Sequence, residues 1–322
     1  MIKPFSILLK PKSLVTVFLS FAITLVHGQS LPSFELNSEW KEKIESMVSN
    51  QKKTHVKKKK KLLIFSLHTG YQHWTIPHTE AVMQMIAQNS GAFEVTPSRD
   101  YTVFNKKNIS KYDVIILNNT NSHGDRRDMF WDIFNKDSTL SQQQKIKKAK
   151  RLEDNIIQFV RKGKGLMLLH GAIVMQNNSI DFSDMTGGSF DYHPPQQKLH
   201  VKLVDPKHPL VSSFDPNGFV HYDEPYFFKN AYYRYDFRPL LYVELDKIKM
   251  NGARPKDKIK YISWIKRYGR GRVFYSSPSH NAQSFENRKF LQFLGNGLLY
   301  TAGLFDCDDS SLKNLYNSRQ VP

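Results

Sequence analysis

A chain of 322 residues, 40% of them hydrophobic, is long enough to bury a large core, as one elaborated domain or as two small ones. It shows no repeat period and no collagen-like or coiled-coil pattern, which excludes fibrous and repeat proteins. The formal net charge of +18 is concentrated partly in two segments near the N-terminus, and the single cysteine, Cys307, excludes an intramolecular disulfide.

The first 28 residues have the pattern of a secretory signal peptide. Three lysines precede the largely apolar run 14–26, and cleavage is expected before Gln29. The run is too short for an ordinary membrane span, and an uncleaved anchor is the alternative. No cysteine lies near the cut, so lipid attachment there is excluded. From this leader we predict an exported protein, periplasmic or secreted, with no membrane span after cleavage. Export without disulfides suits a bacterial envelope protein.

Residues 29–61 are polar and rich in lysine, and we predict that they form an extension of the folded domain. One amphipathic helix fits around Glu39–Val48, with Ser38 as its N-cap. The lysines between 52 and 61 form a block of like charge, which is typical of a solvated tether. The alternative is a site for a polyanion such as acidic polysaccharide, a membrane surface or nucleic acid. No recognition motif accompanies the lysines, so nucleic acid is not expected as a partner.

The next part of the chain alternates strand and helix signals. We expect strands at 62–67, 93–95, 112–117 and 166–169, and helices at 77–90 and 146–160. The run Leu166–Leu169 is apolar throughout, as in a parallel strand that is covered on both faces. This order predicts a doubly wound α/β domain with a largely parallel sheet and helices on both faces.

The second half is less regular and contains long loops, one of which reads GGSFDYHPP at 187–195. We expect strands at 200–204 and 240–245, a C-terminal hairpin of 261–266 with 272–276, and a closing helix through 290–298. The α/β domain is therefore placed at 62–303, and a C-terminal tail at 304–322.

Histidines follow four predicted strand ends: His73, His123, His170 and His280. Any one of them has an ordinary reading as a partly exposed residue. The doubly wound fold, however, brings strand ends to one edge of the sheet, so we expect these histidines to converge. His193 and the Asp223–Glu224 pair lie on loops between them.

Two chemistries fit such a set. Histidines with an acidic residue bind divalent transition metals such as zinc, leaving a position for water or a sugar hydroxyl, although no tight spacing such as HExxH occurs here. Alternatively, histidine and carboxylate act as general acid and base. Nearby aromatic residues either stack on sugar faces or belong to the core: Tyr71, Trp74, Tyr192, Tyr222 and Tyr226.

A nucleophilic serine or cysteine is not expected. The turn after the central strand presents His170, no GxSxG pattern occurs, and Cys307 lies beyond the closing helix. The sequence GRGR at 269–272 is better explained as a hairpin turn than as a nucleotide loop, so no nucleotide cofactor is expected.

Six stretches resemble the ThuA-like (trehalose utilisation) family, in family order across residues 60–303: HTGYQHWTIP at 68–77, FVRKGKGLMLLHGA at 159–172, GGSFDYHP at 187–194, HPL at 208–210, DEPY at 223–226 and YGRGRVFYSSPSH at 268–280. The resemblance implies a flavodoxin-like α/β fold, like that of class I glutamine amidotransferases, and a link to sugar metabolism. It implies a pocket formed by His73, His170, His193, Glu224 and His280. The amidotransferase relatives carry a cysteine where His170 stands, so glutamine hydrolysis is not expected. Ser279 replaces the family's usual glycine.

Two functions are consistent with these residues. The first is a carbohydrate-utilisation enzyme, hydrolase or isomerase-like, that acts on a saccharide or keto sugar; a keto sugar suits imidazole because its carbonyl acidifies the neighbouring C–H. The second is a non-catalytic saccharide-binding protein of the cell envelope. For the enzyme, we predict His170, His280 and Glu224 as catalytic residues, with His170 and His280 as ligands if a metal is bound. The predicted substrate-binding residues are His73, His193, Tyr71, Asp223 and Tyr226.

Overall fold

The computed structural model describes residues 31–317, apart from 52, 251 and 253–255. The predicted signal peptide lies outside these residues. Helices are found at α1 (Ser38–Val48), α2 (Ile76–Ser90), α3 (Lys106–Ile109), α4 (Met129–Asn135), α5 (Gln142–Arg161), α6 (Ile180–Thr186), α7 (Arg288–Thr301) and α8 (Leu312–Asn317). None of the described helices is both long enough and apolar enough to span a membrane.

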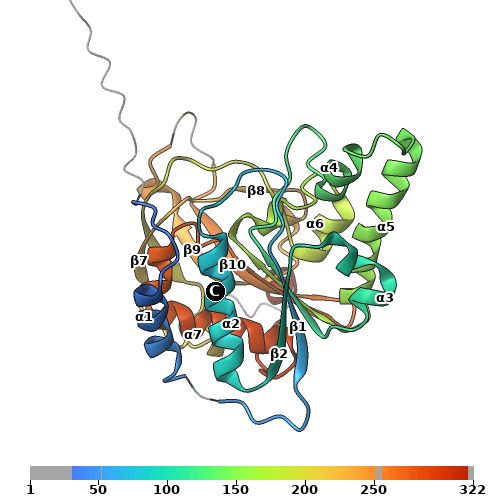
Figure 1. The fold of residues 1–322 in the computed structure, drawn as a ribbon. Coiled ribbons are helices and arrows are strands. Elements are labelled where there is room, and N and C mark those ends of the chain that lie inside the picture. The colour runs from blue at the N-terminus through green and yellow to red at the C-terminus, as the bar shows by residue number, and fades with distance from the viewer. Residues whose placement is uncertain (1–30, 52, 251, 253–255, 318–322) are drawn as a thin grey trace, which may run out of the picture.

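One large sheet forms the centre of the molecule (Figure 1). Its strands are β1 (Lys60–Phe65), β2 (Phe93–Ser98), β3 (Val114–Asn118), β4 (Gly165–Leu169), β6 (Gln197–Leu203), β7 (Phe219–Asp223), β9 (Arg238–Glu244), β10 (Ile259–Tyr268) and β11 (Gly271–Ser276). In the part of the chain that the structure describes, their order is β2-β1-β3-β4-β11-β10-β9-β6-β7, and β5 (Ser189–Phe190) pairs separately with β8 (Phe228–Lys229).

The sheet has a parallel half and an antiparallel half. Every pairing from β2 to β11 is parallel, and every pairing from β11 to β7 is antiparallel. The parallel half has the strand order of flavodoxin-like folds, with β11 in the place of the fifth strand. The predicted C-terminal hairpin is confirmed as β10–β11, and it joins the two halves. The antiparallel half extends beyond this hairpin, because β9, β6 and β7 also pair there.

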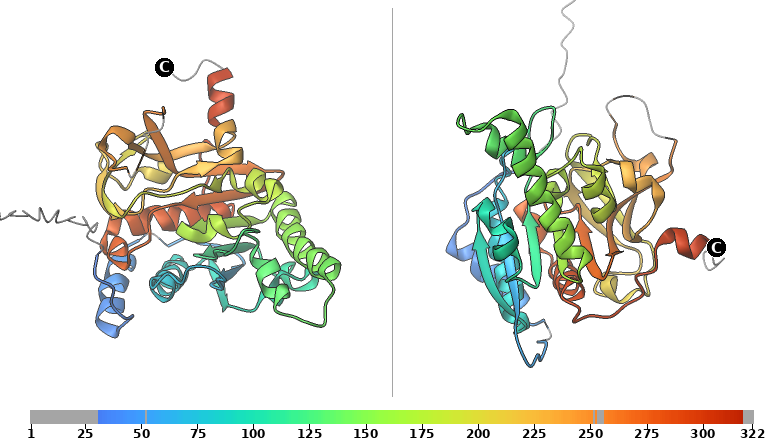
Figure 2. Two further views of the ribbon diagram at one scale, coloured as in Figure 1. Left: turned by 90° about the horizontal axis from the view of Figure 1, so that it is seen from above. Right: turned by 90° about the vertical axis from the view of Figure 1, so that its right-hand side faces the viewer.

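Helices cover both faces of the sheet, as predicted (Figure 2). Successive side chains of a strand point to opposite faces. Leu62 and Ile64 of β1 therefore pack in one apolar cluster with α1, α2 and α7, whereas Leu63 and Phe65 pack in another with α4, α5 and α6. This arrangement confirms the doubly wound α/β class.

The helix α1 packs on the domain, although the sequence suggested that the whole segment 29–61 is an extension. Its buried residues Trp40, Ile44 and Val48 share the cluster of α2 and α7. The N-cap is Asn37, whose side chain accepts a hydrogen bond from the Trp40 amide, and not the predicted Ser38. Amphipathic spacing thus identified the helix, but its docking depends on the apolar surface that α2 and α7 present.

Candidate functional site

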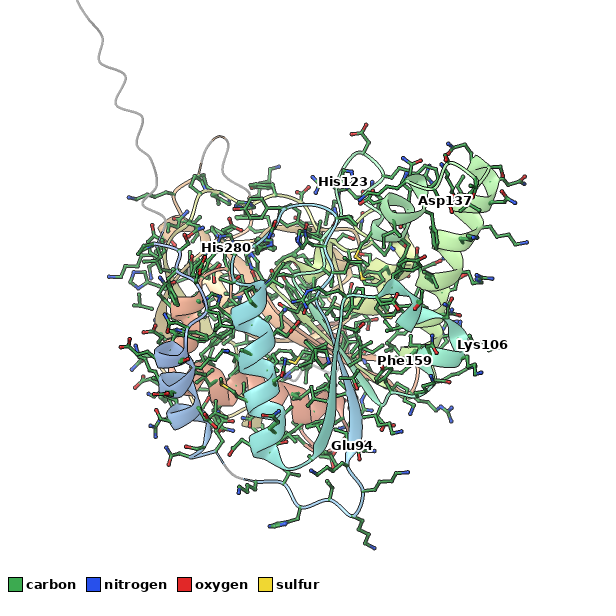
Figure 3. The ribbon with its side chains drawn as sticks, viewed as in Figure 1. Glu94, Lys106, His123, Asp137, Phe159 and His280 are labelled. Atoms are coloured by element: carbon green, nitrogen blue, oxygen red, sulfur yellow. The ribbon has the colours of Figure 1, made fainter. Side chains whose placement is uncertain are left out.

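The loops that follow β1, β3, β4 and β11 meet at the carboxyl ends of the parallel strands. Among the described residues, His73, His170, Glu224 and His280 form a group whose ligand atoms all lie within 4.8 Å of one another. The three histidines are at most 5% exposed. Figure 3 shows His280 on the upper side of the molecule, while Glu94, near the start of β2, lies on the lower side. The expected convergence of strand-end histidines is therefore confirmed for these three.

His170 occupies the sharp turn after the central strand β4, with a left-handed φ of 48°. Its Nδ1 lies 2.7 Å from the carbonyl oxygen of Ser277, which can only accept a hydrogen bond, so Nδ1 carries the proton. Nε2 therefore faces the site, where the Tyr226 hydroxyl lies 3.0 Å away. The next residue is Gly171, where a Cβ would lie 3.0 Å from the His73 ring, closer than ordinary packing allows.

Glu224 is the acidic centre of the group. Its Oε2 lies 3.4 Å from His170 Nε2, 3.1 Å from His280 Nδ1 and 3.8 Å from His193 Nε2. Burial opposes ionisation, but hydrogen bonds to His170 and His280 outweigh it and hold the pKa of Glu224 well below its usual range. For His280, burial lowers the pKa, and the contact with Glu224 raises it by more. Glu224 and His280 thus form a buried carboxylate–imidazolium pair.

Asp223 holds the backbone at His280 in place. Its Oδ2 accepts backbone hydrogen bonds from Ser279 (2.9 Å) and His280 (3.2 Å), and it lies 2.7 Å from His221 Nε2. Burial alone would raise the pKa of Asp223, but the hydrogen bond to His221 lowers it overall. Asp223 was predicted to bind substrate, but it is only 1% exposed and is not among the residues that line the pocket, so these contacts give it a positioning role instead.

His73 is the electrostatic opposite of His280. Burial, followed by the charges of His170 and His280, holds the pKa of His73 well below its usual value, so its ring is neutral. The Asn121 side-chain amide nitrogen lies 3.3 Å from His73 Nδ1 and also donates to two backbone carbonyls at 2.9 Å.

A pocket of about 340 Å³ opens over this group, at the lower end of the size range of small-molecule sites. Its walls combine predicted and new residues: Tyr71, His73, Asn121, Ser122, Arg127, Gly171, Val174, Phe190, His193, Glu224 and Tyr226. The sequence reasoning missed Asn121, Ser122 and Arg127. The sequence feature that points to them is the polar loop after the third predicted strand, of which only His123 was predicted to reach the site.

His123 does not join the group, so its expected convergence is wrong. Its Nδ1 lies 3.0 Å from Asp132 Oδ2 at the start of α4, and its side chain is 56% exposed. Figure 3 shows His123 over a different part of the structure from His280. The physical reason is loop length: Asn121 and Ser122 face the pocket, and the chain has turned toward α4 by position 123.

The predicted aromatic residues divide into two sets. Tyr71 and Tyr226 line the pocket, and the Tyr226 ring stacks on His193 with centroids 5.6 Å apart. Trp74 and Tyr192 instead pack elsewhere, against Phe34 and Phe227. The aromatic surface available to a ligand is therefore formed by Tyr71, Tyr226 and Phe190.

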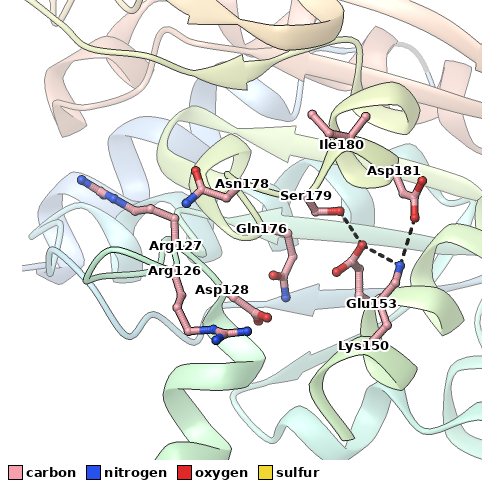
Figure 4. Close-up of a pocket in the computed structure, with 10 residues that line it drawn as sticks. All are labelled: Arg126, Arg127, Asp128, Lys150, Glu153, Gln176, Asn178, Ser179, Ile180 and Asp181. Carbon is pink, nitrogen blue, oxygen red and sulfur yellow. Dashed lines mark hydrogen bonds and ion pairs between the residues drawn. The ribbon is translucent and has the colours of Figure 1, made fainter. Parts of the chain in front are cut away.

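A second pocket, of about 490 Å³, adjoins the first and is drawn in Figure 4. Arg127 lines both pockets. Lys150 Nζ contacts Asp181 Oδ2 at 3.0 Å and Glu153 Oε1 at 3.2 Å, and the Ser179 hydroxyl donates to Glu153 (Figure 4). Lys150, Glu153 and Asp181 are thus paired with one another, so the histidine pocket is the stronger candidate for chemistry.

The histidine group fits a divalent transition metal. His170 Nε2, His280 Nδ1 and Glu224 Oε2 are separated from one another by 3.1, 3.1 and 3.4 Å. Ligands about 2.0–2.1 Å from a tetrahedral zinc lie roughly 3.3 Å apart, so the three atoms are suitably spaced. The Nδ1–H of His170 donates to a backbone carbonyl, as is usual for a metal-bound histidine. His73 fits less well as a fourth ligand, because Asn121 faces its Nδ1, and three ligands leave a position for water or substrate.

The sequence model of the family described as "ThuA: Trehalose utilisation" matches residues 61–301, so the chain belongs to this family. Two solved structures with the same fold are ThuA-like proteins. One, from Bacteroides uniformis, has 17% identity and a TM-score of 0.57, and the match covers 77% of this chain and 93% of that one. The other, from Parabacteroides merdae, has 16% identity and a TM-score of 0.55, with 80% and 99% covered. No curated protein matches the chain.

Proposed function

We propose that this ThuA-family protein is an enzyme of carbohydrate utilisation that transfers protons on a saccharide, and that its substrate is a keto sugar. The observation that supports it is the set of buried His170, buried His280 and partly exposed Glu224 at the base of a pocket lined by polar and aromatic side chains. Family membership supports a role related to trehalose utilisation. The cysteine that amidotransferase relatives use is replaced by His170, so glutamine hydrolysis is not proposed.

The two kinds of imidazole in the site suit opposite ends of a proton transfer. His280 is held as the cation by Glu224, and its proton can polarise a substrate carbonyl. His170 is oriented by the hydrogen bond from its own Nδ1, which directs Nε2 into the site, and in the neutral form of the ring Nε2 can accept a proton from the carbon next to that carbonyl. Neighbouring titratable groups in different environments are the usual arrangement for acid and base roles at one pH.

The remaining pocket residues bind and orient the sugar. Ser122 and Arg127 present polar groups at the wall, and Tyr71, which is 66% exposed, offers a ring face at the rim. Sugar rings stack their C–H faces on aromatic side chains while their hydroxyls take hydrogen bonds. If His170, His280 and Glu224 hold a divalent metal, it supplies Lewis-acid polarisation of a sugar oxygen.

The test is metal analysis combined with turnover of keto and non-keto forms of one disaccharide. Wild type, His170→Ala and His280→Ala are compared, with His123→Ala as the matched histidine outside the group. We expect turnover of the keto form by wild type and His123→Ala only. A stoichiometric metal that is present in the wild type and lost in His170→Ala and His280→Ala would support the metal-bound form. Unchanged turnover in His170→Ala would contradict the proposal.

A second candidate function is saccharide binding without catalysis. It is favoured by the exposed Tyr71 ring and the Tyr226–His193 stack, which form an aromatic platform beside the buried group. In that case the histidines act as hydrogen-bond donors, and the wild type binds the sugar without converting it. His170→Ala should then weaken the affinity for the sugar, as measured by calorimetry. Turnover by wild type excludes this alternative.

Export belongs to the same proposal. The basic start and the apolar run 14–26 are the features that support it. We expect the mature protein to begin at Gln29 in a periplasmic or secreted fraction, which mass determination of the purified protein checks. A lysine placed in the middle of the run, Leu19→Lys, should retain the intact chain inside the cell. Export of that variant at the wild-type level would contradict the signal-peptide assignment.

A further inference from the structure

A basic cleft lies at the end of the sheet opposite the histidine site. Its volume is about 340 Å³, and it is lined by six cationic side chains and by Asp113. The six cations are Lys60, Lys162, Lys164, Arg267, Arg270 and Arg272. The histidine site follows the carboxyl ends of β1, β4 and β11, whereas this cleft surrounds their amino ends, roughly 15–20 Å away for strands of this length.

The cations come from segments that are distant in the sequence. Lys60 begins β1, Lys162 caps α5, and Lys164 directly precedes β4. The three arginines belong to the β10–β11 hairpin, whose turn is held against the end of α5 by a 3.0 Å hydrogen bond from the Arg270 amide to the Arg161 carbonyl. Because the tertiary fold assembles them around one concavity, the cleft differs from a uniformly charged solvated face.

Among the described residues, three of the six cations have an acidic partner and three have none. Lys164 pairs with Asp113 at 2.7 Å, Arg272 pairs with Asp306 at 2.9 Å, and Arg267 pairs with Asp309. Within the described ranges 31–51, 53–250, 252 and 256–317, no carboxylate pairs with Lys60, Lys162 or Arg270. Among the residues that the structure describes, the side chain of Arg270 donates only to the Lys162 carbonyl, at 3.2 Å.

Two helix ends at the cleft account for only part of this charge. The last turns of α5 and α7 lie here, and cations near a helix C-terminus are favoured by the partial negative charge of its carbonyls. That effect accounts for one or two cations per helix. It does not account for the lysines at 57–59 and 61, which are exposed immediately beside Lys60. They lie on the chain that enters β1, whose course is seen in Figure 1.

We propose that this cleft and the lysines at 57–61 bind an acidic polysaccharide, whose carboxylate or sulfate groups replace the missing partners of Lys60, Lys162 and Arg270. Of the described residues that line the cleft, none has an aromatic side chain on which bases could stack, which disfavours single-stranded nucleic acid. None of these described lining residues has a large apolar side chain that could enter a lipid surface either. Repeated anionic groups on a sugar chain match a row of lysines that ends in an anion-sized concavity.

The experiment is affinity measurement on immobilised heparin as the probe, at increasing salt. The variant is Lys60→Gln/Lys162→Gln/Arg270→Gln, and the control of equal charge is Lys136→Gln/Lys147→Gln/Lys198→Gln, whose lysines are exposed and lie outside the cleft. We expect the cleft variant to bind heparin roughly 10- to 100-fold more weakly at low salt, and the control to lose much less. Circular dichroism of both variants checks that they are folded.

Three results would overturn the proposal. One is equal weakening in the cleft variant and the control, which would show a general charge effect. The second is tighter binding to duplex DNA than to heparin, and the third is tighter binding to phosphatidylserine vesicles than to heparin. In both cases the tighter binding would depend on the same three cations, Lys60, Lys162 and Arg270. Turnover at the histidine site is measured in parallel, so a failure of the proposed enzyme function is seen separately from a failure of this inference.

Discussion

The two ends of the central sheet carry their charges in different ways. At the carboxyl ends, Glu224 and His280 are only 12% and 5% exposed and lie 3.1 Å apart, and their contact lowers the pKa of Glu224 and raises that of His280. At the amino ends, Asp113 and Lys164 lie at an even shorter distance, 2.7 Å, but both side chains remain about one-third exposed. Water screens the second pair and not the first. Burial, more than distance, therefore decides how strongly a contact between two charges shifts their pKa values.

The largest expected difference between the two ends of the sheet is in their effect on the turnover rate of the histidine site. His170→Ala should lower kcat by about 10²–10⁴-fold, because it removes the group that accepts the substrate proton. Lys60→Gln/Lys162→Gln/Arg270→Gln should leave kcat for a small sugar unchanged. Steady-state kinetics of both variants on a keto disaccharide provide the measurement. A similar loss of kcat in both would show that the ends are not functionally separate.

The buried pair should also dominate stability, and Glu224→Gln should reduce the free energy of unfolding by about 3–5 kcal/mol, as for other broken buried pairs. Folding lowers the pKa of Glu224, so its contribution is full above its ordinary value of 4.5 and is lost as pH falls toward the folded value. Folding raises the pKa of His280, so its contribution is full below 6.5 and is lost as pH rises through the folded value. The difference between wild type and Glu224→Gln should therefore be largest between pH 4.5 and 6.5.

Urea unfolding at about pH 5.5 and about pH 8.5 measures this dependence. The expected result is a larger difference at the lower pH. A difference that grows toward alkaline pH would contradict the assignment of His280 as the cation of the pair.

A smaller effect is expected from the strained backbone beside His280. Ser279 has a φ of 139°, a conformation that favours glycine, and the family resemblance implies glycine at this position. Among the described residues, its buried hydroxyl has no hydrogen-bond partner. Ser279→Gly should therefore raise the free energy of unfolding by about 1 kcal/mol. Ser277→Gly, at a position without positive φ, should lower it instead. Destabilisation by Ser279→Gly would show that the serine is not strained.

The smallest effect should come from the exposed pair at the amino ends. Burial opposes ionisation of Asp113, but its hydrogen bond to Lys164 outweighs this and lowers its pKa, so its stabilising contribution is present above 3.8 and is lost as pH falls. Asp113→Asn should cost less than about 1 kcal/mol at neutral pH, because the pair is screened. It should also strengthen heparin binding by removing the acidic group of the cleft lining. Weaker heparin binding would place the bound polyanion elsewhere.

The strand-end argument identified part of the site from sequence and missed the rest for a definite reason. His73 and His170 follow β1 and β4, and His280 follows β11, so their convergence required only a parallel arrangement of these strands. His123 satisfied the same argument but lies outside, because a few loop residues were enough to turn the chain away. Glu224 comes directly after β7, at the far edge of the sheet, yet its carboxylate lies 3.1 Å from His280. The sequence placed it only on a loop between the histidines, and the family resemblance assigned it to the pocket.

The sequence by itself determined the alternation of strands and helices, the central apolar strand β4 and the β10–β11 hairpin, because these depend on local periodicity and turn residues. Tertiary structure alone decided that α1 packs on the domain, that Asn121 and Arg127 line the pocket, and that scattered lysines and arginines surround one cleft. It also decided the protonation states of Glu224 and His280. These properties arise from burial and from contacts between residues far apart in the sequence, which no local pattern encodes.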